Sequence, residues 1–359
     1  MMKARNLFLP VCLTTLVLLS AGCKKKSFIP SGPVNFVISS QLPATKTAYS
    51  GETVEGRERI DWIDEDKIAI FMAYVSENSD QEVDGYDILD YTVSDISASG
   101  AKSIAKISPV DEPHFWQDND EGDLWYVFAA LYPSPSVDDS WANEIDLTKL
   151  VLTWPAVQTP TPKGDSGADA LTLLPDMKYA YMFAFPDSPT KRTGSPVSLS
   201  LSPVFTAFEV SISAGDNDEI NLTQFRLLSN NEDQPLARVM DLYSDVSSDE
   251  STSITVDLTG IKLTRDGDPL TLTVFAYADS FSALSLEFTG DEIGTRKLDL
   301  KDGGEWISFH ALYKHRIRGL YFPALDEGSA SGQDINWGGM SGEDLGWNGA
   351  DGEDINWRN

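Results

Sequence analysis

Apolar and polar side chains alternate along much of this chain with a period of two, which is the period of a β-strand. The runs are short, rich in β-branched and aromatic residues, and bounded by Asp, Gly and Pro. They fall at residues 34–38, 67–71, 124–128, 179–183, 197–201, 208–212, 254–256, 270–274 and 306–309. Apart from the ambiguous stretch 141–150, no long segment carries an apolar stripe of helical period. The pattern therefore predicts an all-β protein.

Length and turn signals extend this prediction to a domain organisation. Many short strands with frequent turns and no intervening helices are typical of β-sandwiches. The 359 residues are enough for two domains, at the usual ~100 to 200 residues each. A polar, linker-like stretch at 190–196 sets the expected boundary near residue 195. We expect two tandem β-sandwich domains, at 34–195 and 196–325, followed by an extended tail at 326–359.

The beginning of the chain has the pattern of a bacterial lipoprotein signal. A positively charged start is followed by an apolar run at 7–20, too short to span a bilayer, and by small residues directly before Cys23. We expect residues 1–22 to be removed as a signal peptide, Cys23 to be acylated, and residues 23–33 to form a lipidated linker. The alternative is ordinary signal cleavage with an incidental cysteine. The lipoprotein interpretation places the protein in the cell envelope.

Charge and cysteine content narrow the functional classes. The chain has 56 acidic and 27 basic residues and a net charge of −29. Because residues 1–22 contain two basic residues and no acid, the mature chain would carry −31. Such a surface repels nucleic acid, so we expect no nucleic-acid partner. Cys12 would leave with the signal peptide, and the mature chain would then have no thiol for a disulfide or a zinc–cysteine site.

The tail contains a ten-residue repeat. The segments SGQDINW, SGEDLGW and DGEDINW begin at residues 331, 341 and 351. In an extended chain, the aliphatic residue and the tryptophan of each unit lie on one face because they are two residues apart. A glycine- and acid-rich tail is also typical of disorder, and both interpretations stay open for the free monomer. The regular tryptophans favour a segment that becomes ordered when it meets a groove or a sheet edge.

Several phrases resemble the fimbrillin family of Bacteroidetes fimbrial subunits. They are TKTAYSG at 45–51, RIDW at 59–62 leading into DKIAI at 66–70, FAALYPSPS at 128–136, YAYM at 179–182, FTAFEV at 205–210, and WISF at 306–309 with Tyr313. They span most of the mature chain, in the order found in the family. The resemblance implies two transthyretin-like, Greek-key β-sandwich domains, export as a lipoprotein to the outer membrane, and polymerisation into a surface fimbria that supports adhesion.

The resemblance also implies an assembly chemistry. In fimbrillins a trypsin-like protease removes the lipidated N-terminal strand, and a C-terminal strand of a neighbouring subunit fills the groove that this opens. The candidate displaced strand carries Val34, Phe36 and Ile38. The candidate cleavage sites are Lys46, Arg57 and Arg59, and for these residues ordinary solvation of a loop is the alternative. The candidate donor residues are Ile335, Trp337, Leu345, Trp347, Ile355 and Trp357.

Other roles stay open beside this one. Lys24, Lys25 and Lys26 follow Cys23 where surface lipoproteins of these bacteria tend to carry acids, so lipidation is better supported than surface display. Shaft, tip and anchor subunits all fit the resemblance. The alternative from another class is a non-polymerising surface lipoprotein whose exposed tryptophans bind glycans, with surface glycans or host proteins as partners.

No catalytic constellation stands out. The chain has only three histidines, and they are scattered. The acidic clusters at 118–123 and 216–219 lack the ligand spacing of an EF-hand loop. We therefore expect no enzyme activity, no metal site and no cofactor.

Overall fold

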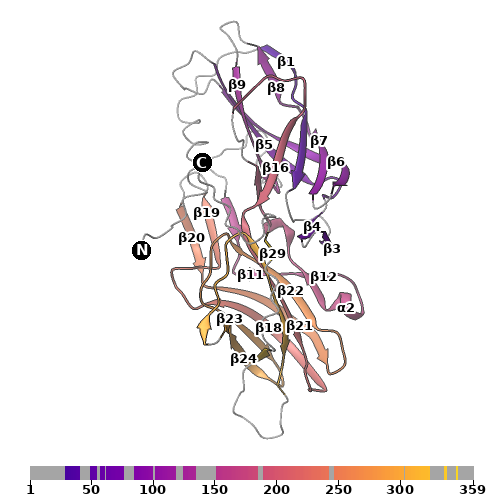
Figure 1. Ribbon diagram of the computed structural model, residues 1–359, viewed down its shortest axis with the longest axis vertical. Coiled ribbons are helices and arrows are strands. Elements are labelled where there is room, and N and C mark those ends of the chain that lie inside the picture. The colour runs from indigo at the N-terminus through magenta and orange to yellow at the C-terminus, as the bar shows by residue number, and fades with distance from the viewer. Residues whose placement is uncertain are drawn as a thin grey trace. The chain divides into compact units, whose positions relative to one another are not determined.

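The computed structural model describes residues 29–40, 49–54, 57–60, 62–76, 85–99, 102–118, 124–134, 151–184, 189–241, 246–302, 304–323, 335–337 and 345–346. In this part of the chain nearly all regular structure is β-strand, which confirms the all-β prediction (Figure 1). No helix among these residues is long and apolar enough to cross a membrane.

The chain divides into two compact units. The first comprises Met1–Leu152, Ala180–Pro203 and Met240–Val246, and the second comprises Thr153–Tyr179, Val204–Val239 and Ser247–Asn359. This division differs from the single boundary that we expected near residue 195. A segment of the first half contributes strands to the second unit, and the strand that begins at Val197 belongs to the first.

The first unit is built on one large sheet. In its described part the strand order is β14-β16-β2-β7-β6-β5-β9-β15, and β14 also pairs with β9, so the sheet closes on itself. Because β14 pairs with β16 on one side and with β9 on the other, it leaves no free edge where the sheet closes. Two antiparallel two-stranded pairs, β1 with β8 and β3 with β4, accompany it. The strands of this unit are β1 (Ile29–Pro33), β2 (Phe36–Ser40), β3 (Tyr49–Val54), β4 (Arg57–Ile60), β5 (Lys67–Ser76), β6 (Gly85–Ser99), β7 (Lys102–Pro109), β8 (Phe115–Asp118), β9 (Leu124–Tyr132), β14 (Met182–Ala184), β15 (Thr190–Lys191) and β16 (Val197–Pro203).

The second unit is a sandwich of two sheets. One has the order β11-β21-β18-β23-β24, and the other has the order β12-β13-β22-β17-β27-β28, with β29 also on β27. A single core lies between them, formed by alternate residues of both sheets such as Phe208, Phe225 and Phe288. The elements are β11 (Val157–Gln158), β12 (Thr161–Pro162), α2 (Gly167–Ala170), β13 (Thr172–Leu174), η4 (Met177–Tyr179), β17 (Phe205–Ser213), β18 (Glu219–Ser229), β21 (Ser253–Thr264), β22 (Leu270–Tyr277), β23 (Leu284–Gly290), β24 (Gly294–Asp299), β25 (Lys301–Asp302), β26 (Glu305–Trp306), β27 (Tyr313–Tyr321), β28 (Asn336–Trp337) and β29 (Leu345–Gly346). A further small sheet joins β10 (Val151–Trp154), β19 (Ala237–Asp241) and β20 (Val246–Ser251).

Most of the strands expected from alternation are present, but two differ. The run at 179–183 begins with the last residue of the 3-10 helix η4, and its strand, β14, starts only at Met182. In the run at 306–309, only Trp306 belongs to a strand, while Phe309 makes an isolated bridge to Phe281. The left-handed conformations of Gly304 and Leu312 flank this run and limit its length.

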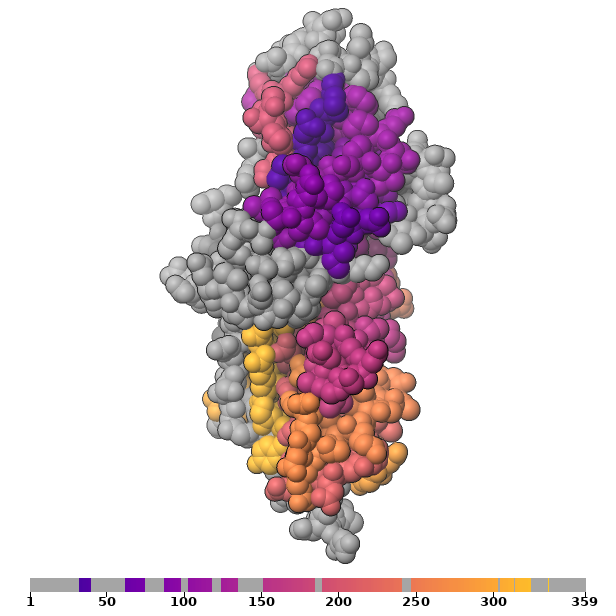
Figure 2. Space-filling view, turned by 90° about the vertical axis from the view of Figure 1, so that its right-hand side faces the viewer, coloured from indigo at the N-terminus to yellow at the C-terminus, as the bar shows by residue number. Residues whose placement is uncertain are grey.

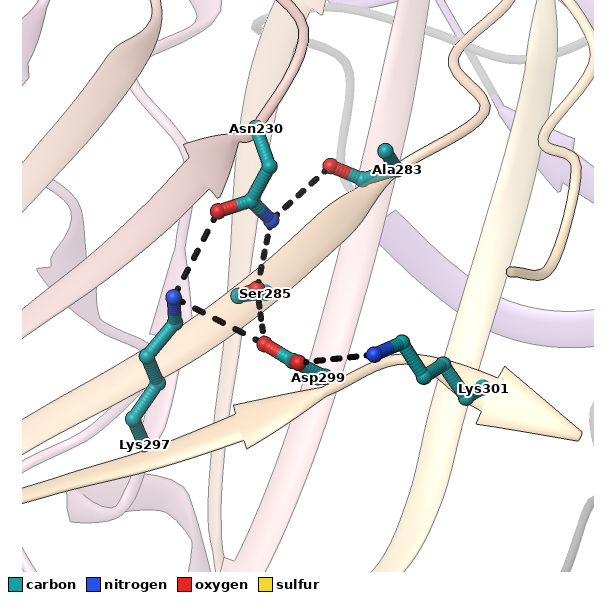
Figure 3. Close-up of polar contacts among 6 residues, drawn as sticks. All are labelled: Asn230, Ala283, Ser285, Lys297, Asp299 and Lys301. Atoms are coloured by element: carbon teal, nitrogen blue, oxygen red, sulfur yellow. Dashed lines mark hydrogen bonds and ion pairs between the residues drawn. The ribbon is translucent and has the colours of Figure 1, made fainter. Parts of the chain in front are cut away.

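A polar network joins the ends of three strands in the second unit (Figure 3). The Asn230 amide nitrogen donates to the Ala283 carbonyl at 3.1 Å and to the buried Ser285 hydroxyl at 2.7 Å. The hydroxyl in turn donates to the Asp299 carboxylate at 2.8 Å, and Lys297 and Lys301 pair with the same carboxylate. Burial alone would raise the pKa of Asp299, but the Ser285 hydrogen bond and the two lysines outweigh it and hold that pKa below its usual range.

The network predicts that Ser285→Ala lowers the free energy of unfolding by about 1–3 kcal/mol, because it removes the donor to Asp299 and the acceptor for Asn230. Urea unfolding measures this change. Ser308→Ala, at an exposed serine of the same unit, is the control and should stay within about 0.5 kcal/mol of the wild type. Equal stability of the two variants would contradict the prediction.

Candidate assembly site

The candidate displaced strand, β2, lies inside the closed sheet of the first unit. It pairs in parallel with β16, from Phe36 opposite Val197 to Ser40 opposite Leu201. On its other side it pairs antiparallel with β7, from Val37 opposite Lys106 to Ser40 opposite Ser103. Figure 2 shows β2, in indigo, along the surface of the unit, with rose residues on one side and violet residues on the other. A segment from the start of the chain therefore completes two ladders at once.

The side chains of this segment alternate between the core and the surface. Val34 and Phe36 are 3% and 4% exposed, and Ile38 is fully buried, all within the core of the first unit. Asn35, between them, is exposed and uses its carbonyl, which accepts from the Val197 N–H at 2.8 Å. The face that carries Val34, Phe36 and Ile38 is thus the buried face of the strand. Three adjacent apolar sites hold the strand in place.

The site that holds Phe36 is walled by rings. The rings of Tyr91 and Phe128 meet Phe36 edge to face at centroid distances of 5.4 Å, and the His114 ring lies at 6.1 Å. Aromatic pairs prefer this geometry because the positive edge of one ring meets the negative face of another. The backbone adds a contact, since the Val34 N–H donates to the His114 carbonyl at 2.8 Å. The Phe36 site, defined as the space bounded by Tyr91, His114 and Phe128, therefore selects an aromatic side chain.

His114 is neutral in this site at physiological pH. Burial lowers its pKa to about 4, against a smaller opposing effect of the hydrogen bond to the Ile70 carbonyl. Because a carbonyl only accepts, Nε2 carries the proton and donates at 2.8 Å. Nδ1 is then an acceptor, and among the described residues it has no hydrogen-bond partner. The Asp87 carboxylate lies 3.9 Å away, beyond hydrogen-bond distance.

The candidate cleavage sites differ in their surroundings. Arg57 and Arg59 lie in β4, whose backbone pairs with β3 from Val54 opposite Arg57 to Tyr49 opposite Ile60. Lys46 lies outside the described residues, in the chain between β2 and β3, and Cys23 lies outside them as well.

Part of the C-terminal repeat pairs with the second unit. Ile335 is 3% exposed within its core, and β28 pairs antiparallel with β27, Trp337 opposite Leu320. β29 pairs with the same strand, Leu345 opposite Lys314. The first two repeat units therefore contribute backbone to the outer side of β27. Trp347, Ile355 and Trp357 lie outside the described residues.

The strand that receives the tail also carries a buried ion cluster. Glu209 of β17 pairs with Lys314 at 2.7 Å and with Arg318 at 2.7 Å, and Arg316 lies at 3.4 Å. Glu209 and Lys314 are almost completely buried. Burial alone would raise the pKa of Glu209, but Lys314, Arg318 and Arg316 outweigh it and lower that pKa to about 2. The cluster joins β17 to β27.

Two acidic side chains of the segment 216–219 form ion pairs with basic side chains. Asp218 pairs with Arg265 at 2.9 Å and Glu219 with Lys262 at 2.8 Å. Within the described residues, no group of three or more His, Cys, Asp or Glu side chains is arranged to hold a metal ion.

Similar proteins were found only among solved structures. No protein-family model matches the chain, and no curated protein matches it. Candidate cell adhesion proteins from Bacteroides ovatus and Bacteroides uniformis share 12% and 13% identity, with TM-scores of 0.48 and 0.45. The alignments cover 89% and 88% of this chain and 99% and 98% of the other chains. A fimbrial assembly protein from Parabacteroides distasonis shares 11% identity at a TM-score of 0.37, over 80% of this chain and 90% of the other.

These descriptions name the same kind of protein as the fimbrillin resemblance does. Because their TM-scores are below 0.5, a function for this chain has to be inferred from its own residues.

Sequence reasoning missed two features of these strands. In the sequence His114 is only one of three scattered histidines, although in the structure it borders the Phe36 site. Glu209 stands in an alternating run, where a carboxylate would be expected to face solvent, yet it is buried against β27. The only signal for the second feature was the alternation of Lys314, Arg316 and Arg318, which puts three cations on one face of a strand.

The burial pattern of β2 predicts that Ile38→Ala lowers the free energy of unfolding by about 2–5 kcal/mol, through lost apolar contact and a residual cavity. Val37→Ala, at a half-buried position of the same strand, should cost less than half as much. Guanidinium unfolding followed by tryptophan fluorescence compares the two. A larger loss for Val37→Ala would mean that the strand presents its other face to the core.

The ion cluster predicts a pH-dependent stability. Because the pKa of Glu209 is lowered from 4.5 to about 2, its stabilising effect is fully present above pH 4.5 and is lost as the pH falls toward 2. Glu209→Gln should lower the free energy of unfolding by about 3 kcal/mol at pH 7, since it leaves buried cations without their carboxylate.

The difference between wild type and Glu209→Gln should shrink steadily between pH 4.5 and pH 2. Glu305→Gln, at an exposed carboxylate, serves as the control and should be close to neutral throughout. A Glu209→Gln deficit that stays constant over this range would contradict the account.

Proposed function

We propose that this protein is a subunit of a cell-surface fimbria that is exported as a lipoprotein and assembles by protease-triggered strand exchange. Cys23 would hold the immature chain at the outer membrane. Cleavage after β2 would release the lipidated segment, and the C-terminal tail of a neighbouring subunit would enter the vacated position. The partners would be other fimbrial subunits, and the polymer would support adhesion.

The insertion of β2 between β16 and β7 is the observation that carries the proposal. If this strand left, β16 and β7 would each lose a ladder, and the sites of Val34, Phe36 and Ile38 would be empty. Burial of such side chains is worth roughly 1.5–3 kcal/mol each, and a backbone hydrogen bond ~0.5–1.5 kcal/mol net. An opened first unit would therefore bind an extended apolar segment strongly.

The tail has the properties that a donor needs. Its first two repeat units already pair with a strand of the second unit at Asn336–Trp337 and Leu345–Gly346. This supports a tail that adopts extended structure when it meets a sheet edge. The ten-residue repeat also supplies more than one aliphatic–x–aromatic segment for the purpose.

Among the three candidate cleavage sites we propose Lys46, because the other two, Arg57 and Arg59, lie in a paired strand. A protease binds its substrate as an extended, unpaired segment, and Arg57 and Arg59 belong to the paired strand β4. A cut after Lys46 would release β1 and β2 and keep the β3–β4 pair with the rest of the chain.

The glycan-binding alternative needs exposed tryptophans, and three of the described tryptophans are buried. Trp62, Trp116 and Trp154 are each less than 5% exposed and offer no ring face to a sugar.

The proposal predicts the behaviour of the mature chain under limited trypsin treatment. Mass spectrometry should find a new N-terminus after Lys46, and the trimmed protein should form ladders on gels and polymers in light scattering. Lys46→Gln should delay cleavage and polymerisation together, while Arg57→Gln and Arg59→Gln, as matched controls, should change neither. A chain trimmed after Lys46 that stays monomeric at high concentration would refute strand exchange.

A further inference from the structure

The displaced segment and the tail share an order of side-chain types. Val34, Asn35 and Phe36 form an aliphatic–Asn–aromatic triplet, and Ile355, Asn356 and Trp357 repeat it. The first repeat unit has the same triplet, whereas the second has glycine in place of asparagine. In the first structural unit, the side chains of Val34 and Phe36 lie in the core, and Asn35 contributes only its backbone carbonyl.

We propose that the triplet Ile355–Asn356–Trp357 of a neighbouring copy takes the place of Val34–Asn35–Phe36, with the Trp357 ring in the Phe36 site. This inference rests on the proposed strand exchange and adds its register, its direction and its specificity-determining residue. The donor would run parallel to β16, as β2 does. Ile355 would fill the Val34 site, and Asn356 would take the exposed position of Asn35.

The third repeat unit is the one available for this role. Ile335 is already buried in the core of the second structural unit, and Leu345 and Gly346 of the second repeat pair with β27. Eight residues, 347–354, separate β29 from Ile355. Fully extended, they span roughly 26 Å. The triplet can therefore extend beyond β27, which pairs with the first two repeats.

Charge selects the register. Sliding the donor by two residues in one direction would bring Glu353 to the buried Val34 site, and sliding it in the other would bring Asn359 to the Phe36 site. Burying an unpaired carboxylate is far more costly than burying an amide. The proposed register and the second slide each bring Asn359 to an apolar site, at Ile38 and at Phe36 respectively. Only the proposed register fills both the Val34 site and the Phe36 site with apolar side chains.

His114 explains why the donor carries tryptophan where the displaced strand carries phenylalanine. Its Nδ1 is a buried acceptor without a hydrogen-bond partner among the described residues, and its ring borders the Phe36 site. Phe36 has no donor to offer. An indole N–H is a donor only. A tryptophan could therefore donate to His114 Nδ1 and also pack its ring against the three surrounding rings.

Assembly of the trypsin-trimmed mature chain tests the specificity residue. Trp357→Ala should slow polymer growth about tenfold or more, as expected for the loss of a large buried side chain. Trp347→Ala is the matched control and should grow at the wild-type rate, and Trp357→Phe should fall between the two because it keeps the ring and loses the N–H. Light scattering at equal protein concentration measures all of them.

Disulfide trapping tests register and direction. Position 37 of the displaced strand lies opposite Ser198 in β16, so Arg358 of the donor should lie opposite Ser198 of the acceptor. The Arg358→Cys, Ser198→Cys double variant should form disulfide-linked polymers after trimming, because paired residues of adjacent strands lie within disulfide range. Arg358→Cys with Thr206→Cys, which is in β17 of the second unit, should not.

The outcomes separate the inference from the function on which it rests. If the trimmed wild-type chain fails to polymerise, strand exchange itself is refuted. If it polymerises and Trp357→Ala grows like the wild type, the Phe36 site is filled by another residue and this inference is wrong. If Trp357→Ala is slow but the 358–198 disulfide does not form, the proposed direction is wrong.

Discussion

The two-sided pairing of β2 is the constraint on which the first unit depends. The strand joins β16 to β7, and its core-facing side chains complete the apolar interior of the ring. Backbone polar groups that face each other across a missing strand would have to find water or another strand. A chain folded in this way keeps its own beginning as an internal part of a sheet, and any segment that can form the same two ladders is a competitor for that place.

The C-terminal end of the chain pairs with the second unit in a different way. Among the described residues, β28 and β29 pair with β27 alone, so each has a single ladder there. A strand gains more by entering a slot with two partners than by lying at an edge, because twice as many backbone groups are paired. The buried Glu209 cluster holds β27 to β17 independently of the tail. The edge that receives the tail therefore does not need the tail in order to stay in its sheet.

Local patterns were sufficient to predict much of the fold, and the reason is visible at 34–38. Alternation identified the strand and its buried face, since the side-chain period of a strand is fixed by its backbone. The neighbours of this strand could not be read from the same pattern: β16 lies about 160 residues away, and it pairs in parallel. For the same reason the boundary near residue 195 differs from the observed division, because β16 follows the linker-like stretch but completes the first unit. The burial of Glu209 depends on its pairing with β27, which is also remote in sequence.

Hydrogen exchange of those β16 and β7 backbone amides that point toward β2 tests the central claim most directly. In the intact chain these amides should be protected. After removal of the segment that contains β2, they should exchange much faster, and protection should return when the trimmed chains assemble. If these amides keep their protection after trimming, β2 does not hold the sheet together, and the account is contradicted.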